Sequence, residues 1–115
     1  MPAATVAAHF TGKDPVVRKI YDRLLDRAAR FGPVTEDPKQ TSIHLTRGTA
    51  FAGVATKRDG IVVTLKSTSD IRSARIVKRL RASANRWYFD VKLTSPAQVD
   101  RQVTGWLARS IELSR

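Results

Sequence analysis

The fold of this chain is decided by residues 41–65, which read TSIHLTRGTAFAGVATKRDGIVVTL. Arg47-Gly48 and Asp59-Gly60 have turn composition, and Asp-Gly between apolar runs is a strong hairpin signal. The residues between and around these turns are rich in apolar and β-branched side chains, as in strands. The stretch therefore predicts three antiparallel strands joined by two short turns, a β-meander.

A helix is predicted ahead of the meander. Asp14 and Pro15 have the residue types of an N-cap and a first helical position. Apolar residues then recur with helical spacing until Gly32-Pro33, a pair that ends helices. Residues 1–13 are expected to form a loose arm, and residues 14–115 a single domain. A short edge strand is one option for residues 34–36.

A fourth strand and a second helix are predicted after the meander. Residues 87–94 alternate between apolar and polar side chains, and Ser95-Pro96-Ala97-Gln98 forms a capping box that starts a helix. Residues 69–86 predict a short helix or packed loop, and residues 69–84 are expected to cover part of the second face of the sheet through Ile71, Ile76 or Leu80. The fold class is therefore α+β: an antiparallel sheet with two long helices packed on one face. The periodicities assign these side chains to one core: Leu24, Phe51, Trp87, Phe89, Val91 and Trp106.

Positive charge is the strongest compositional feature. The 115 residues include 21 Lys and Arg against 10 Asp and Glu, a net charge of +11. Such an excess favours an anionic partner, either nucleic acid, the ribosome or an acidic membrane surface. The alternative is a solvated basic surface without a partner. The chain has no cysteine and no apolar run long enough to span a membrane, which fits a cytoplasmic protein.

The charge is densest in residues 72–86. Arginine binds phosphate through paired hydrogen bonds, and phosphate contacts require no particular base sequence. The segment therefore predicts non-enzymatic binding to the phosphate backbone of DNA or RNA. The predicted nucleic-acid-binding residues are Arg72, Arg75, Lys78, Arg79, Arg81 and Arg86.

A second interpretation uses the polar face of the sheet. Strand alternation predicts that His44, Thr64 and Tyr88 approach one another there, as a pocket of a small-molecule-binding or protein-binding module. Tyr88 among basic residues could also stack on a base, although a tyrosine at the rim of a core has the same pattern. The sequence has no catalytic motif and no spaced metal ligands, so neither an enzyme nor a cofactor or metal is predicted. A weak enzyme that uses His44 is the third alternative.

Several short motifs along the chain form a further pattern: HFTGK (9–13), KQTSIHL (39–45), TAFAGV (49–54), VKLTSPAQVD (91–100) and GWL (105–107). With them the chain resembles a small bacterial domain family of unknown function, sometimes labelled "predicted transport protein". The resemblance covers nearly the whole chain and implies no catalytic residues. It implies that related domains occur alone, behind another uncharacterised domain, or at the end of restriction-like nucleases. The nuclease context favours a nucleic-acid partner.

Overall fold

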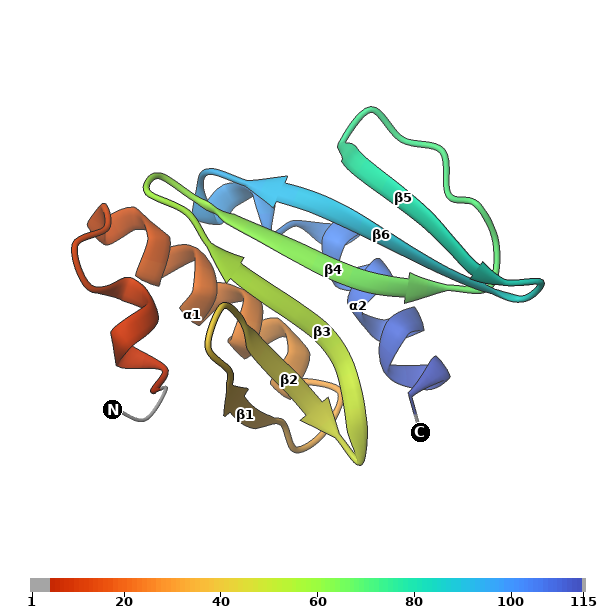
Figure 1. Ribbon diagram of the computed structural model, residues 1–115, viewed down its shortest axis with the longest axis horizontal. Helices are drawn as coiled ribbons and strands as arrows, with labels where there is room; N and C mark the ends of the chain where they lie inside the picture. Colours follow the sequence, from red (N-terminus) through yellow and green to blue (C-terminus); the bar gives the residue numbers. More distant parts are fainter. Residues whose placement is uncertain (1–4, 115) are drawn as a thin grey trace.

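The computed structural model describes residues 5–114 as one antiparallel sheet with two long helices, an α+β fold (Figure 1). The helical elements are η1 (Ala7–Phe10), α1 (Pro15–Ala29), η2 (Pro96–Gln98) and α2 (Arg101–Leu113). The strands are β1 (Thr35–Pro38), β2 (Ile43–Arg47), β3 (Thr49–Thr56), β4 (Ile61–Ser67), β5 (Ile76–Ser83) and β6 (Arg86–Leu93).

The predicted meander is confirmed as β2, β3 and β4. Gly48 makes the first turn with a φ of +83°, a conformation that glycine adopts without strain. The second turn is closed by Lys57, whose backbone N–H donates to the carbonyl oxygen of Gly60 at 2.8 Å. A Cβ on Gly60 would lie 2.4 Å from the carbonyl oxygen of Leu93, so only glycine fits beside β6.

The sheet has more strands than the sequence pattern indicates. Its order is β1-β2-β3-β4-β6-β5, with all neighbours antiparallel. β6 is the strand predicted at residues 87–94, and β1 lies near the edge strand considered at residues 34–36. The prediction of a short helix or packed loop at residues 69–86 is wrong for residues 76–83, which form β5. Pairing with the next strand, β6, outweighs the weak local pattern of this segment.

Both helices lie behind the sheet in the view of Figure 1. α2 packs against β3 and β4, and α1 packs against β4 and α2. The buried core fills the space between the helices and this face of the sheet, and it includes Leu24, Phe51, Phe89 and Val91 as predicted.

The two tryptophans lie at the edge of this core. Trp106 is half-buried and meets the ring of Phe89 edge-on, with 5.4 Å between centroids. Trp87 is half-buried outside the core cluster, with the Arg81 guanidinium 5.8 Å from its ring centroid. The prediction of one shared core therefore holds for Trp106 only as a packed neighbour, and not for Trp87.

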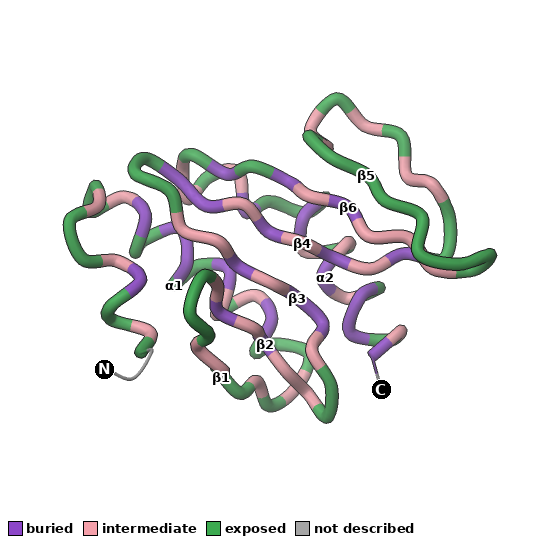
Figure 2. The backbone as a smooth tube through the Cα atoms, in the orientation of Figure 1, coloured by how far each residue is buried: buried purple, intermediate pink, exposed green. Residues whose placement is uncertain are grey.

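The opposite face of the sheet is open: no helix covers it in the part of the chain that the structure describes (Figure 1). The prediction that residues 69–84 cover this face is wrong. β5 extends the sheet at its edge, where seven of its eight residues are exposed (Figure 2). Ile71 and Ile76 pack instead against the helix-side core. The open face therefore remains accessible from solvent.

Residues 7–13 are attached more closely than the predicted loose arm. His9 is buried, and its Nε2 lies 2.8 Å from the carbonyl oxygen of Lys39. Lys13 donates from Nζ to the carbonyl oxygen of His9 at 2.6 Å, and Phe10 packs on Tyr21 at 5.2 Å between centroids. Residues 1–4 of the predicted arm lie outside the described residues.

Candidate ligand-binding pocket on the open face of the sheet

One row of residues crosses the open face from β2 to β6. His44 on β2 pairs with Gly53 on β3, Gly53 with Thr64 on β4, and Thr64 with Asp90 on β6. Side chains at directly opposed positions lie on the same face of a sheet. The next row along the strands pairs Lys66 with Tyr88. Strand register therefore gathers polar side chains from β2, β4 and β6 around Gly53 of β3.

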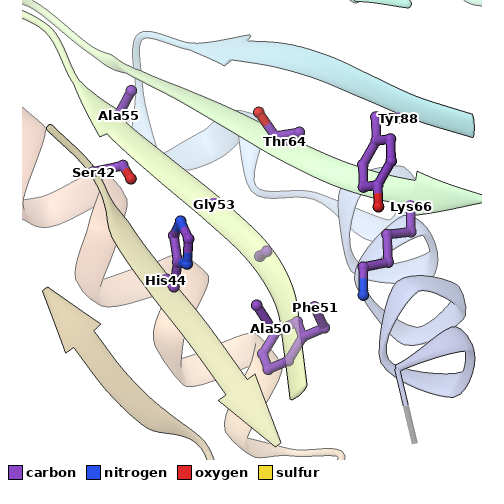
Figure 3. Close-up of a pocket in the computed structure, with 10 residues that line it drawn as sticks. Ser42, His44, Ala50, Phe51, Gly53, Ala55, Thr64, Lys66 and Tyr88 are labelled. Atoms are coloured by element: carbon purple, nitrogen blue, oxygen red, sulfur yellow. The ribbon is translucent and has the colours of Figure 1, made fainter. Parts of the chain in front are cut away.

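A pocket of about 420 Å³ opens over these two rows (Figure 3). His44 lies at one side and Tyr88 at the other, with Gly53 and Thr64 between them. The structure thus brings together all three residues of the predicted pocket, His44, Thr64 and Tyr88. The other residues that line it are Ser42, Ala50, Phe51, Ala52, Gly53, Ala55 and Lys66.

Apart from Phe51, the β3 wall of the pocket is made of small residues. A register shift opposite Leu45 and Thr46 leaves Phe51 without a cross-strand partner, which is the signature of a β-bulge. Ser110 on α2 holds the bulge by donating its hydroxyl to the carbonyl oxygen of Phe51 at 2.5 Å. The bulge brings Phe51 and Ala52 into the lining together with Gly53. Small apolar residues here leave space above the strand.

Gly53 is the least expected residue of the pocket. A Cβ at this position would lie 3.8 Å from Cβ of Thr64 and 4.0 Å from Cδ2 of His44, which is ordinary van der Waals contact. Its φ lies outside the left-handed region that favours glycine. Packing within the chain therefore does not require glycine, although glycine inside a strand lowers stability. A glycine in such a place often marks the close approach of a ligand or another backbone.

Lys66 supplies positive charge to the pocket. Its Nζ donates to the hydroxyl of Ser114 at 2.9 Å, and burial lowers the pKa of the Lys66 ammonium below its ordinary value. The nearby Arg86 guanidinium lowers that pKa further. An anion bound beside Lys66 would raise this pKa, because an opposite charge offsets both effects.

Thr64 and Tyr88 also border a second hollow. Its volume is about 240 Å³, and its other lining residues are Lys78, Leu80 and Asp90. The Thr64 hydroxyl donates to Oδ1 of Asp90 at 2.6 Å, so this carboxylate is held on the β5 side of the first pocket. The two hollows together extend across β2, β3, β4, β6 and β5.

The six predicted nucleic-acid-binding residues do not form one surface. Strand pairing sets Lys78 opposite Asp90 on the open face, whereas Arg79 lies opposite Phe89 and Arg81 opposite Trp87. Arg81 remains exposed at the sheet edge, and Arg86 lies near Lys66.

Three of these six residues form ion pairs within the chain. Arg72 and Arg79 contact Asp70 at 3.0 and 3.5 Å. Arg75 donates from Nη1 to both carboxylate oxygens of Asp100 at 3.0 Å and from Nη2 to the carbonyl oxygen of Gln98 at 2.7 Å. Arg75 therefore ties the segment before β5 to the start of α2. Nucleic-acid binding by the six residues stays a prediction.

Sequence reasoning missed Gly53 and Lys66 as pocket residues. The alternation of β4 could have added Lys66, because it follows Thr64 by two residues. The significance of Gly53 depends on distances across three strands, which a single sequence does not provide.

The described residues, 5–114, contain no cluster of three His, Cys, Asp or Glu side chains that could hold a metal ion. Within the same range, no helix is both long enough and apolar enough to cross a membrane.

Fold and site together define a small α+β domain with one covered and one open sheet face. Residues 6–114 match the model of a protein family described as "Domain of unknown function (DUF5655)", and the chain belongs to this family. Neither a curated protein nor a solved structure matches the chain.

Proposed function

We propose that this domain is a non-enzymatic binding module that takes a small anionic ligand into the pocket on the open face. The observation that carries the proposal is Gly53, which leaves space at the centre of the pocket that the fold itself does not require. A flat or apolar part of the ligand would lie on the small residues of β3. The anionic group would lie near Lys66, and His44, Thr64 and Tyr88 would orient it.

A panel of matched compounds tests the proposal. Phenyl phosphate, benzoate and adenosine monophosphate carry a flat ring and an anion, and benzamide and adenosine are the neutral counterparts. We expect the anionic compounds to shift the backbone amide NMR signals of His44, Gly53 and Tyr88, and the neutral compounds to bind at least about tenfold more weakly. Equal binding of both groups, or shifts confined to other surfaces, would contradict the proposal.

Lys66→Gln and Lys92→Gln form a matched pair for the same titration. Each removes one positive charge from the open face, but only Lys66 lines the pocket, whereas Lys92 is exposed and lies opposite Val62. We expect Lys66→Gln to remove the preference for anions and Lys92→Gln to retain it. Equal effects of the two substitutions would show that general charge attraction, and not the pocket, governs binding.

Nucleic-acid binding is the second candidate function. It is favoured by the net charge of +11 and by Lys78, Arg81 and Arg86, which make no ion pair within residues 5–114. A bacterial setting beside restriction-like nucleases, which the family resemblance implies, would suit such a partner, and so would the cytoplasmic location expected from the composition. The engagement of Arg72, Arg75 and Arg79 within the chain makes this the weaker candidate.

Titrations with duplex DNA, single-stranded DNA and RNA at increasing salt test this candidate. Each phosphate contact contributes a log–log salt slope of about −0.9 on duplex DNA. We expect Arg81→Ala with Arg86→Ala to weaken binding to all base sequences equally and to flatten the slope by about one unit per lost contact. No binding at low salt, or binding unchanged by the double substitution, would overturn the assignment of nucleic-acid binding to β5 and β6.

A further inference from the structure

A second group of basic residues lies in the helix layer, on the other side of the sheet from the pocket. Arg23 and Arg27 on α1 and Arg30 at its C-cap follow one another at spacings of four and three residues, so they form one stripe. Arg101 faces them from the first turn of α2. The four arginines line one groove of about 360 Å³ between the two helices.

Contacts within the chain already hold two of these side chains in place. Arg23 donates from Nε to the carbonyl oxygen of Val99 at 3.2 Å. Arg27 has only 20% of its side chain exposed and donates to Asp26 at 3.1 Å. Each contact uses only one of the N–H donors of a guanidinium. The remaining donors of the group are therefore available to a ligand.

Asp100 in the groove and Asp26 beside it do not balance the charge of the four arginines. Asp26 contacts Arg27 at 3.1 Å and Arg30 at 3.4 Å, but its side chain is 61% exposed. Both carboxylate oxygens of Asp100 accept from Arg75, and Asp100 also accepts from the backbone N–H of Val103. Arg23 and Arg27 carry like charges four residues apart on one helix, a spacing at which such charges generally repel. A multivalent oxyanion in the groove would remove this repulsion.

We propose that the groove between α1 and α2 is a phosphate-binding site formed by Arg23, Arg27, Arg30 and Arg101. Guanidinium groups match phosphate oxygens in paired hydrogen bonds, and several convergent arginines favour a polyanion over a single weak acid. The phosphate belongs either to a free oligophosphate or to a nucleic-acid backbone, which share this chemistry. The site is independent of the pocket on the open face and uses none of its residues.

Tripolyphosphate is the first probe, compared with sodium chloride at equal ionic strength. We expect tripolyphosphate to raise the melting temperature beyond the effect of sodium chloride and to bind measurably by calorimetry. Arg23→Gln with Arg27→Gln should weaken this binding at least about tenfold. Lys19→Gln with Arg109→Gln removes the same charge at exposed positions outside the groove, and this control should retain tight binding.

Arg101→Gln keeps the test valid if the double variant on α1 folds poorly, because it changes the opposite wall of the groove. It should also weaken tripolyphosphate binding. A titration with duplex DNA separates the two sources of phosphate. If the ligand is a nucleic-acid backbone, the groove variants should lose DNA binding as well. If it is a free oligophosphate, they should lose only tripolyphosphate binding. Equal effects of tripolyphosphate and sodium chloride, or equal weakening by the control pair, would overturn the proposal. The variant Gly53→Val changes the pocket on the open face and leaves this groove intact. Loss of ligand binding at one site can therefore be measured independently of the other.

Discussion

Glycines at three places in this chain have three different physical roles. At Gly60 a side chain would collide with the carbonyl oxygen of Leu93. At Gly53 a side chain would fit, and the missing atoms become part of a pocket. At Gly105, on the exposed surface of α2, a Cβ would have no heavy atom within 4 Å. The distances around each glycine decide whether adding a side chain there raises or lowers the stability of the fold.

Gly105→Ala should stabilise the protein. Alanine loses less backbone entropy in a helix than glycine, and nothing in the described structure opposes the added methyl group. We expect the free energy of unfolding in denaturant to rise by about 0.5–1 kcal/mol. Gly60→Ala is the control of opposite sign and should destabilise. A loss of stability in Gly105→Ala would indicate that this face of α2 is covered in solution.

Trp106→Ala should lower the free energy of unfolding by about 2–3 kcal/mol. This is less than the roughly 3–5 kcal/mol of a fully buried tryptophan, because Trp106 is only half-buried. The loss includes its edge-on contact with Phe89. Trp106→Phe should retain part of the contact and lie between wild type and Trp106→Ala in a denaturant titration. A change near zero for Trp106→Ala would contradict its packing against the core.

At the scale of elements, the start of α2 is coupled to the segment before β5. Burial alone would raise the pKa of Asp100, but hydrogen bonds from the Val103 N–H and from Arg75, with the charge of Arg75, hold that pKa below its ordinary value of 3.8. A depressed pKa in the folded state adds stability that is present above the unfolded pKa and is lost as the pH falls through the folded value.

Asp100→Asn should therefore reduce stability near neutral pH and change little in strong acid. Asparagine still caps the helix, so the substitution mainly removes the ion pair with Arg75. We expect the difference in free energy of unfolding between wild type and variant to shrink below about pH 4. Denaturant titrations across that range measure it. A difference independent of pH would mean that the Asp100 charge contributes nothing to the coupling.

The elements differ in how far the sequence could predict them. The meander, β6 and both helices have local signals: tight turns, alternation and capping residues. β5 has no such signal, because basic residues occur on both of its faces and Ile76, Val77 and Leu80 do not alternate. Its structure depends on pairing with β6. The candidate site divides in the same way. The local alternation of the strands predicts His44, Thr64 and Tyr88, whereas Gly53 and the groove between the helices depend on segments that meet only in the folded structure.

At the scale of the whole molecule, charge is spread over both sides of the sheet. Lys66 and Lys78 lie on the open face, and the four groove arginines lie in the helix layer. With a net charge of +11, the folded state repels itself more than a neutral domain would. The two proposed sites are places where bound anions would reduce this repulsion.

The melting temperature should therefore rise as sodium chloride is added at neutral pH. Screening weakens long-range repulsion between exposed charges, whereas short, partly buried pairs such as Arg75–Asp100 are screened less. A scan of melting temperature against salt measures the balance. A steady fall would mean that attractive surface pairs outweigh the net repulsion.

The central claim is that Gly53 leaves space for a ligand and that the fold does not require glycine there. The measurement that tests it most directly compares Gly53→Ala and Gly53→Val with wild type, both in denaturant and in titrations with phenyl phosphate and adenosine monophosphate. We predict that Gly53→Ala is as stable as wild type or more stable by up to about 1 kcal/mol, and that binding weakens from Gly to Ala to Val. Unchanged binding in folded Gly53→Val, or a marked loss of stability in Gly53→Ala, would contradict the account.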